Sequence, residues 1–81
     1  MPRFFLHSRR RSGELARDLE GQDLPGLEAA QEMATATIRE LLADEIKHPR
    51  RNSLEAIIIT DKDGKELTTI RAEEILPEHL R

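Results

Sequence analysis

Residues 27–47, LEAAQEMATATIRELLADEIK, decide the fold of this chain. Apolar residues recur at spacings of three and four, and charged or polar residues fill most of the positions between them. The apolar positions are Leu27, Ala30, Ala34, Ile38, Leu41, Leu42 and Ile46. The pattern predicts an amphipathic helix roughly 30 Å long. Because such a helix needs a packing partner to be stable in water, the rest of the chain is expected to supply a sheet against its apolar face.

Both ends of the predicted helix carry the residues that helix ends prefer. Gly26 can serve as the N-cap, and Leu24 can pack against the first turn. Lys47 and His48 suit the negative C-terminal end of the helix dipole. Pro49 disfavours helical geometry at the residue before it. The helix is therefore expected over residues 27–47.

Four stretches have the composition of strands: residues 3–8, 14–19, 54–60 and 65–71. The first and third carry bulky residues on both faces, so they are expected inside the sheet, with the other two at its edges. Residues 61–64, DKDG, predict a hairpin turn in which Gly64 takes a positive φ. Residues 72–81 predict a short helical turn stopped by Pro77.

These elements predict one α+β domain over residues 1–81, with the order ββαββ. The two bulky strands in the middle give a four-stranded antiparallel sheet of spatial order 2-1-3-4. The long helix crosses one face of this sheet by a right-handed connection.

Composition bounds the classes of protein to which the chain can belong. The 81 residues include no Cys, Trp or Tyr and two Phe, with a formal net charge of −3. Without Cys, disulfides, thiolate metal sites and cysteine nucleophiles are excluded. No apolar run approaches the roughly 20 residues of a membrane span, and the start lacks a secretory leader. We therefore expect no membrane association and a cytoplasmic location.

Candidate chemical sites are weak. Asp61, Asp63, Gly64 and Glu66 imitate the start of a calcium loop, but the later ligands of an EF-hand are missing, and a hairpin turn explains them. The three histidines, in separate elements with no shared spacing, are His7, His48 and His79. No serine lies in a nucleophile motif, and no glycine-rich loop could cradle a phosphate. The sequence predicts no catalytic residue, no cofactor and no metal, so the protein is not expected to be an enzyme.

Basic residues gather in two links that the predicted topology places at the same end of the sheet. They are Arg9, Arg10, Arg11, Lys47, Arg50 and Arg51, with His48 among them. A phosphate backbone would be attracted to such a patch. However, no aromatic stacking platform accompanies the arginines, and the acidic helix would repel a nucleic acid. A solvated rim is the favoured interpretation, and an anion or nucleic-acid patch is the alternative.

The predicted alternation leaves an apolar group on the sheet face away from the helix. It comprises Phe5, His7, Ile57, Ile59 and Ile70. An exposed patch this apolar is unusual on a monomer. A two-fold partner supplying the same face would cover it, so this group is predicted to be an interaction face and the protein a homodimer. Ile75, Leu76 and Leu80 could cover only part of it.

Several motifs together resemble a family of short bacterial proteins, found chiefly in rhizobia and their relatives, that is catalogued as a domain of unknown function. The motifs are MPRFFLH at residues 1–7, Asp18 to Gly21, Leu24-Pro25 with LEAA at residues 27–30, and the DKDG turn. The chain departs from the family in having arginines at positions 9–11, where an acidic residue and Gly are usual, and Gly26 in place of an Asp cap. The resemblance implies no activity.

A second resemblance lies in residues 23–26, DLPG, which lead into an alanine-rich helix. The layout is similar to that of antitoxin partners of small RNA-cleaving toxins, whose sheet-plus-helix domains bind the toxin. It is a likeness of arrangement alone.

Taken together, the residues favour an uncharacterised, non-catalytic protein-interaction or regulatory module that acts as a homodimer, with an unknown protein partner. The alternative is a nucleic-acid-binding module that uses the basic patch.

Overall fold

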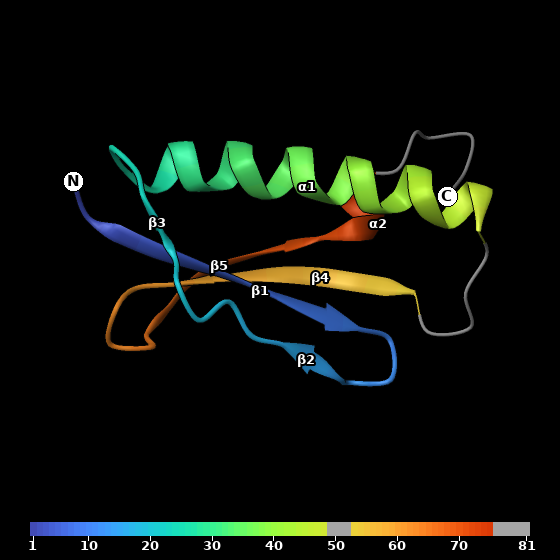
Figure 1. The fold of residues 1–81 in the computed structure, drawn as a ribbon, viewed down its shortest axis with the longest axis horizontal. Coiled ribbons are helices and arrows are strands. Elements are labelled where there is room, and N and C mark those ends of the chain that lie inside the picture. The colour runs from blue at the N-terminus through green and yellow to red at the C-terminus, as the bar shows by residue number, and fades with distance from the viewer. Residues whose placement is uncertain (49–52, 76–81) are drawn as a thin grey trace.

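A computed structural model of the protein describes residues 1–48 and 53–75. These residues form two layers, with one long helix lying across an antiparallel sheet (Figure 1). In chain order the elements are β1 (Arg3–Arg10), β2 (Leu15–Ala16), β3 (Gln22–Asp23), α1 (Leu27–Lys47), β4 (Leu54–Thr60), β5 (Glu66–Arg71) and α2 (Ala72–Ile75). The predicted α+β class, with an antiparallel sheet and one long helix, is confirmed.

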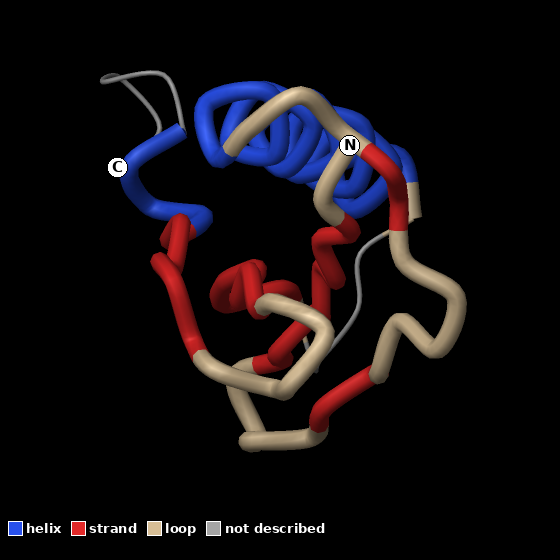
Figure 2. The backbone as a smooth tube through the Cα atoms, turned by 90° about the vertical axis from the view of Figure 1, so that its left-hand side faces the viewer, coloured by secondary structure: helices blue, strands red, loops and turns tan. Residues whose placement is uncertain are grey.

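The sheet has the order β2-β1-β4-β5, and β3 also pairs with β1. All of these pairings are antiparallel. The prediction of four strands in the order 2-1-3-4 was wrong, because residues 22–23, which were expected within a connection, form a fifth strand opposite Arg3 and Phe4. Figure 2 shows α1 above the strands, with the loops that join strands on the side away from the helix.

The strand predicted over residues 14–19 is much shorter than expected. β2 contains two residues, Leu15 and Ala16, which lie opposite Arg9 and Ser8 of β1. Beyond it the chain leaves the ladder, because the side chain of Asp18 accepts the N–H of Leu6 in place of a strand carbonyl. A side-chain acceptor therefore ends the strand that propensity alone would continue.

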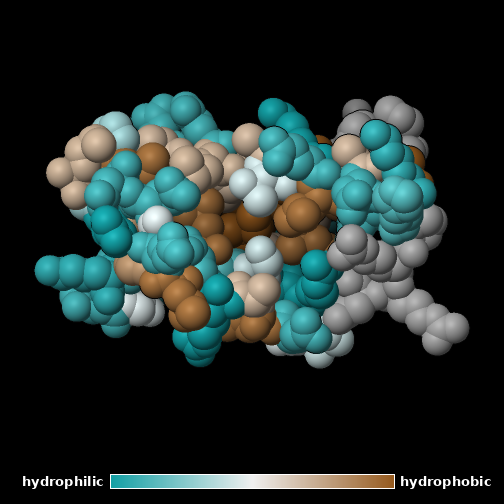
Figure 3. Space-filling view, viewed as in Figure 1, coloured by the Kyte–Doolittle hydropathy of each residue, from teal (hydrophilic) through white to brown (hydrophobic). Residues whose placement is uncertain are grey.

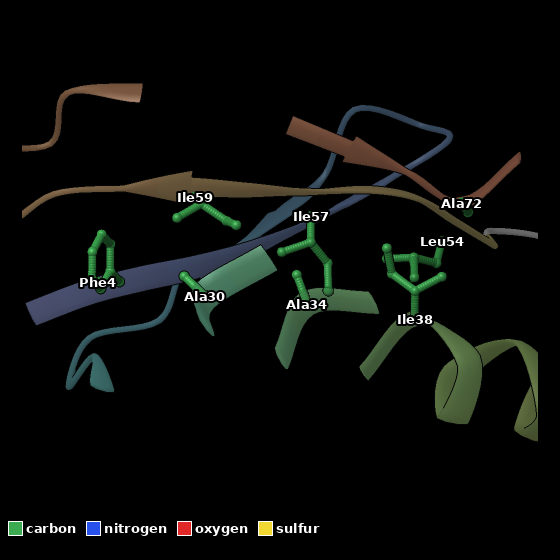
Figure 4. Close-up of a cluster of buried hydrophobic side chains, with 8 residues drawn as sticks. All are labelled: Phe4, Ala30, Ala34, Ile38, Leu54, Ile57, Ile59 and Ala72. Atoms are coloured by element: carbon green, nitrogen blue, oxygen red, sulfur yellow. The ribbon is translucent and has the colours of Figure 1, made fainter. Parts of the chain in front are cut away.

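The helix packs on the sheet through small residues at its centre. Ala30, Ala34 and Ile38 are fully buried. The core that they join also contains Phe4, Leu54, Ile57, Ile59 and Ala72 (Figure 4). Leu27 and Ile46, at the two ends of the predicted stripe, are exposed. The apolar stripe thus forms the core at its centre and is exposed to solvent at both ends.

Local signals at the ends of α1 and in the second hairpin agree with the sequence. Gly26 is the N-cap of α1, and His48 is its C-cap, with its N–H bonded to the carbonyl of Asp44. In the 61–64 turn, Gly64 has φ of 84° and donates its N–H to the carbonyl of Asp61 at 3.1 Å. The two ends of α1 and the hairpin turn are therefore set by the backbone preferences of the residues that form them.

After β5 the chain forms the single helical turn α2, which packs against the core through Ala72. The predicted stop at Pro77 and the partial cover by Leu76 and Leu80 lie outside the described residues. In Figure 3, apolar side chains follow the seam between α1 and the sheet on the side where β1 lies. None of the helices in residues 1–48 and 53–75 is long and apolar enough to cross a membrane.

Candidate interaction surface

The structure divides the apolar face that was predicted to bind a second copy. Ile57 and Ile59 are buried beneath α1, and Ile70 packs against the same core. The reason is the register, because Leu6 of β1 lies opposite Ile59, and opposite residues of an antiparallel pair share a face. Leu6 faces the helix, so Ile59 does as well. The placement of these three isoleucines on the outer face was therefore wrong.

Phe5 and His7, the other two predicted residues, do lie on the outer face of the sheet. Their rings stack with centroids 6.4 Å apart. Opposite them in β4 lie Thr60 and Ile58, and both Phe5 and Ile58 are half-buried. The outer face therefore carries apolar and polar side chains side by side, which is ordinary for a sheet with one solvated face.

The imidazole of His7 makes a hydrogen bond at each of its two ring nitrogens. The Nδ1 atom of His7 accepts the backbone N–H of Asp18 at 3.0 Å, and its Nε2 atom lies 3.1 Å from Oγ1 of Thr60. Because Nδ1 is an acceptor, the neutral ring carries its proton on Nε2, which donates to Thr60. The imidazole of His7, in β1, therefore connects the backbone at Asp18 to Thr60 of β4.

The carboxylate of Asp18 accepts three backbone N–H groups, from Leu6 at 3.2 Å, Glu20 at 3.3 Å and Gly21 at 3.0 Å. Burial raises the pKa of this carboxyl, but the three N–H donors outweigh that effect. The net pKa of Asp18 is lowered from its ordinary value. The carboxylate therefore acts as a structural acceptor.

The outer edge of β1 is closed along most of its length. β2 pairs with Ser8 and Arg9, the Asp18 carboxylate binds the N–H of Leu6, and β3 pairs with Arg3 and Phe4. An ion pair also joins β3 to β1. The Nε and Nη2 atoms of Arg3 donate to Oδ1 and Oδ2 of Asp23, at 2.9 and 3.0 Å. The side-chain hydrogen bond and the charge of Asp23 raise the pKa of Arg3, and the same contact lowers the pKa of Asp23.

The opposite edge of the sheet, formed by β5, is open. Within residues 1–48 and 53–75, β5 pairs with β4 alone, and no backbone hydrogen bond reaches its other side. Its six residues, ELTTIR, contain no Pro, Gly or Lys. Natural proteins commonly block an exposed edge with Pro or with charged side chains, and the charged residues of β5 are Glu66 and Arg71, one at each end of the strand. β5 therefore presents a row of unpaired N–H and C=O groups.

The predicted basic patch is assembled in part. Arg11 donates its backbone N–H to the carbonyl of Ser53 at 2.9 Å and its Nε to the hydroxyl of the same residue at 2.8 Å. The link after β1 and the link before β4 thus meet at one end of the sheet, as the topology implied. Arg9 is paired with Glu55 at 2.8 Å, and Lys47 is exposed at the end of α1. Arg10 is half-buried, and Arg50 and Arg51 lie outside the described residues.

A pocket of about 310 Å³ lies at the same end, between α1, β4 and α2. Its lining is Leu42, Glu45, Ile46, Leu54, Ala72, Arg11 and Ser53. Glu45 already accepts the N–H of Leu54 at 2.9 Å, and Arg11 and Ser53 bind each other. These polar side chains thus make hydrogen bonds that join the helix end and the two links.

The other candidate chemistry is dispersed or structural. Oδ1 of Asp61 accepts the N–H groups of Asp63 and Lys65, both at 2.9 Å, so the DKDG segment is a hairpin turn closed on itself. His7 and His48 lie in β1 and beyond the end of α1, and His79 is outside the described residues. In the described part of the chain, no three His, Asp or Glu residues are grouped so that they could hold a metal ion.

Sequence reasoning missed the residues that matter most at the edges. It identified residues 65–71 as an edge strand, but not the register shift beside the hairpin that sets the faces of its side chains. It also missed Asp18 as the acceptor that closes the β1 edge. The available signal was the spacing of Asp18 and Gly21, because Asp followed closely by Gly is typical of a side-chain-capped turn.

The fold and its edges define a small two-layer α+β protein whose sheet is covered by one long helix and, in the residues that the structure describes, is closed at one edge and open at the other. The family described as "Domain of unknown function (DUF6894)" matches residues 3–73, so the chain belongs to this family. No curated protein and no solved structure matches the chain.

Proposed function

We propose that this protein is a non-catalytic interaction module that acts as a homodimer and binds other protein chains through its sheet. The observation that carries the proposal is the contrast between the two sheet edges. One edge is closed by two short strands and the Asp18 carboxylate, whereas β5 is unpaired on its outer side in the described part of the chain. An extended segment can add to such an edge through main-chain hydrogen bonds.

The contrast supports binding because an open edge is otherwise a hazard. Unpaired strand edges promote aggregation, and proteins usually block them with proline, charge or covering elements. This chain covers the β1 edge with several separate contacts, whereas in the described part of the chain β5 has no covering element and no proline, and its charged residues, Glu66 and Arg71, stand at its two ends. A functional partner for β5 explains why the two edges are treated differently. Regulation would then follow from which segment occupies the edge.

Sedimentation equilibrium over a dilution series tests the homodimer. We expect a monomer–dimer equilibrium at micromolar concentration, and a wild type that stays monomeric throughout would refute the homodimer. Amide hydrogen exchange at high and low protein concentration gives an independent reading. The amides of β5 should exchange more slowly when the protein is concentrated, whereas those of β1, which are already covered, should not change.

A second candidate function is nucleic-acid binding, and the contact between Arg11 and Ser53 favours it. That contact brings the arginine-containing link after β1 to the link that follows α1. The salt dependence of binding to DNA or RNA is the test. A steep loss of affinity with rising salt, abolished by substituting Arg9, Arg10 and Arg11 with Ala, would support this candidate over the first. Because Arg9 is already neutralised by Glu55, we expect little binding.

A further inference from the structure

We infer that the β5 strands of two copies pair antiparallel across a two-fold axis at Thr69, which joins two sheets into one continuous sheet. The inference rests on the proposed homodimer and specifies its interface. A second copy of the chain is the occupant, and both copies would carry α1 on the same face of the joined sheet. This face relationship follows because the axis that relates antiparallel neighbours is perpendicular to the sheet.

The faces of the β5 side chains are fixed by its pairing with β4. Arg71 lies opposite Ala56 and Thr69 opposite Ile58, on the outer face of the sheet. Ile70 and Thr68 lie opposite Ile57 and Ile59, on the face toward the helix. A two-fold axis perpendicular to the sheet must match outer residues with outer residues and inner residues with inner ones.

A register shift places one more charged residue on the outer face. Thr60 pairs with Glu66, whereas its neighbour Ile59 pairs with Thr68, so Leu67 has no opposite residue. Thr69 donates its hydroxyl to a carboxylate oxygen of Glu66 at 3.2 Å, which requires the two side chains to share a face. The outer face of β5 therefore carries, in chain order, the carboxylate of Glu66, the hydroxyl of Thr69 and the guanidinium of Arg71.

An axis at Thr69 makes this order self-complementary. Thr69 of one copy then lies opposite Thr69 of the other. Arg71 of each copy lies opposite Leu67 of the other, one position from Glu66, whose carboxylate is on the same face and within reach of the long Arg71 side chain. On the inner face Thr68 lies opposite Ile70. The interface thus gains two ion pairs and two apolar contacts by symmetry. Within the described residues Arg71 has a loose, exposed partner, Glu73, at 3.8 Å.

The neighbouring choice of axis does not fit. An axis at Thr68 sets Glu66 against Ile70, although the first lies on the outer face and the second on the inner face. The pairing cannot continue further toward the C-terminus, because α2 begins at Ala72. Thr69 is therefore the position at which faces, charges and strand length all agree.

Charge reversal with rescue tests the ion pairs. Arg71→Glu and Glu66→Lys should each weaken dimerisation about tenfold in sedimentation equilibrium, since each replaces two attractions with two repulsions. The double variant should restore most of the loss, because the pairs are re-formed with reversed sign. Glu32→Lys and Arg39→Glu, on the outer side of α1, are matched controls that should leave the equilibrium unchanged.

A cysteine at the axis tests the register itself. The chain has no Cys, and opposite residues of an antiparallel pair have Cα atoms about 4.5–5.5 Å apart, which a disulfide can span. Thr69→Cys should therefore give a covalent dimer on mild oxidation, whereas Ala36→Cys on α1 should give far less. If the wild type sediments as a dimer but Thr69→Cys does not cross-link, or both reversals leave the dimer intact, the β5 interface is wrong and the homodimer stands. A monomeric wild type would refute both proposals.

Discussion

The Nδ1 atom of His7 accepts the backbone N–H of Asp18 at 3.0 Å, while the carboxylate of Asp18 accepts the N–H of Leu6, the residue before His7, at 3.2 Å. Two bonds in opposite directions thus join β1 to the segment that follows β2. Each replaces a ladder hydrogen bond that a regular edge strand would make. The pair therefore closes the β1 edge without a long second strand, whereas β5 is open on its outer side in residues 1–48 and 53–75.

Stability should fall in acid because of Asp18. Its pKa is lowered in the folded protein, so its contribution is fully present above the ordinary carboxyl pKa of about 3.9 and is lost as the pH falls through the lower folded pKa. Asp18→Asn should be less stable than the wild type at neutral pH, and the difference should shrink in this acid range. Urea denaturation at a series of pH values measures it, and a constant difference at all pH values would contradict the role of the charge.

Gly21 should tolerate no side chain. Its φ is 74°, and a Cβ atom there would lie 2.9 Å from side-chain atoms of both Arg3 and Phe5 and 3.0 Å from the carbonyl oxygen of Phe4. Gly13 also has a positive φ, of 94°, but nothing lies within 4 Å of its Cβ position. Both substitutions by Ala incur a backbone cost of roughly 1–2 kcal/mol.

Gly21→Ala should therefore destabilise the protein by about 1–3 kcal/mol more than Gly13→Ala, because the crowded site adds an overpacking cost. The free energies of unfolding from chemical denaturation give the comparison. Equal losses for the two variants would mean that the 18–21 segment can move away from β1 without penalty.

Asp61 should matter for the hairpin, and its neighbour Asp63 should not. Asp61 Oδ1 accepts two backbone N–H groups at 2.9 Å, whereas the described contacts of Asp63 involve its backbone. Asp61→Ala should cost about 1 kcal/mol, since water can partly replace the lost acceptor, and Asp63→Ala should change the melting temperature little. Millimolar calcium should not raise the melting temperature of the wild type. A rise that Asp61→Ala abolishes would instead identify a cation site.

Local signals predicted α1 and the DKDG turn well, because each is decided by residues near one another in the chain. The range Leu27–Lys47, the N-cap Gly26 and the positive φ of Gly64 all follow from such preferences. The isoleucines of β4 likewise predicted a strand in the interior of the sheet. These elements need no knowledge of what packs against them.

The faces and edges of the sheet were not predictable in the same way. Alternation along β4 places Ile57 and Ile59 on one face of the sheet and Ile58 on the other, but it does not determine which face packs against the helix. That is decided by the register with β1, where Leu6 lies opposite Ile59. β3 escaped prediction because two residues carry too little pattern; it pairs with Arg3 and Phe4 of β1, and the side chains of Arg3 and Asp23 form an ion pair across this pairing. Both depend on contacts between distant residues.

The corrected faces of β4 can be tested with two substitutions of the same chemistry in adjacent residues. Ile59 has no exposed surface and contacts the core beneath α1, whereas Ile58 is half-buried on the outer face. Ile59→Ala should cost about 3 kcal/mol, the usual price of a cavity in a packed core. Ile58→Ala should cost about 1 kcal/mol, because less apolar surface is re-exposed. Chemical denaturation of both variants gives the two values, and a larger loss for Ile58→Ala would restore the original assignment of Ile57 and Ile59 to the outer face.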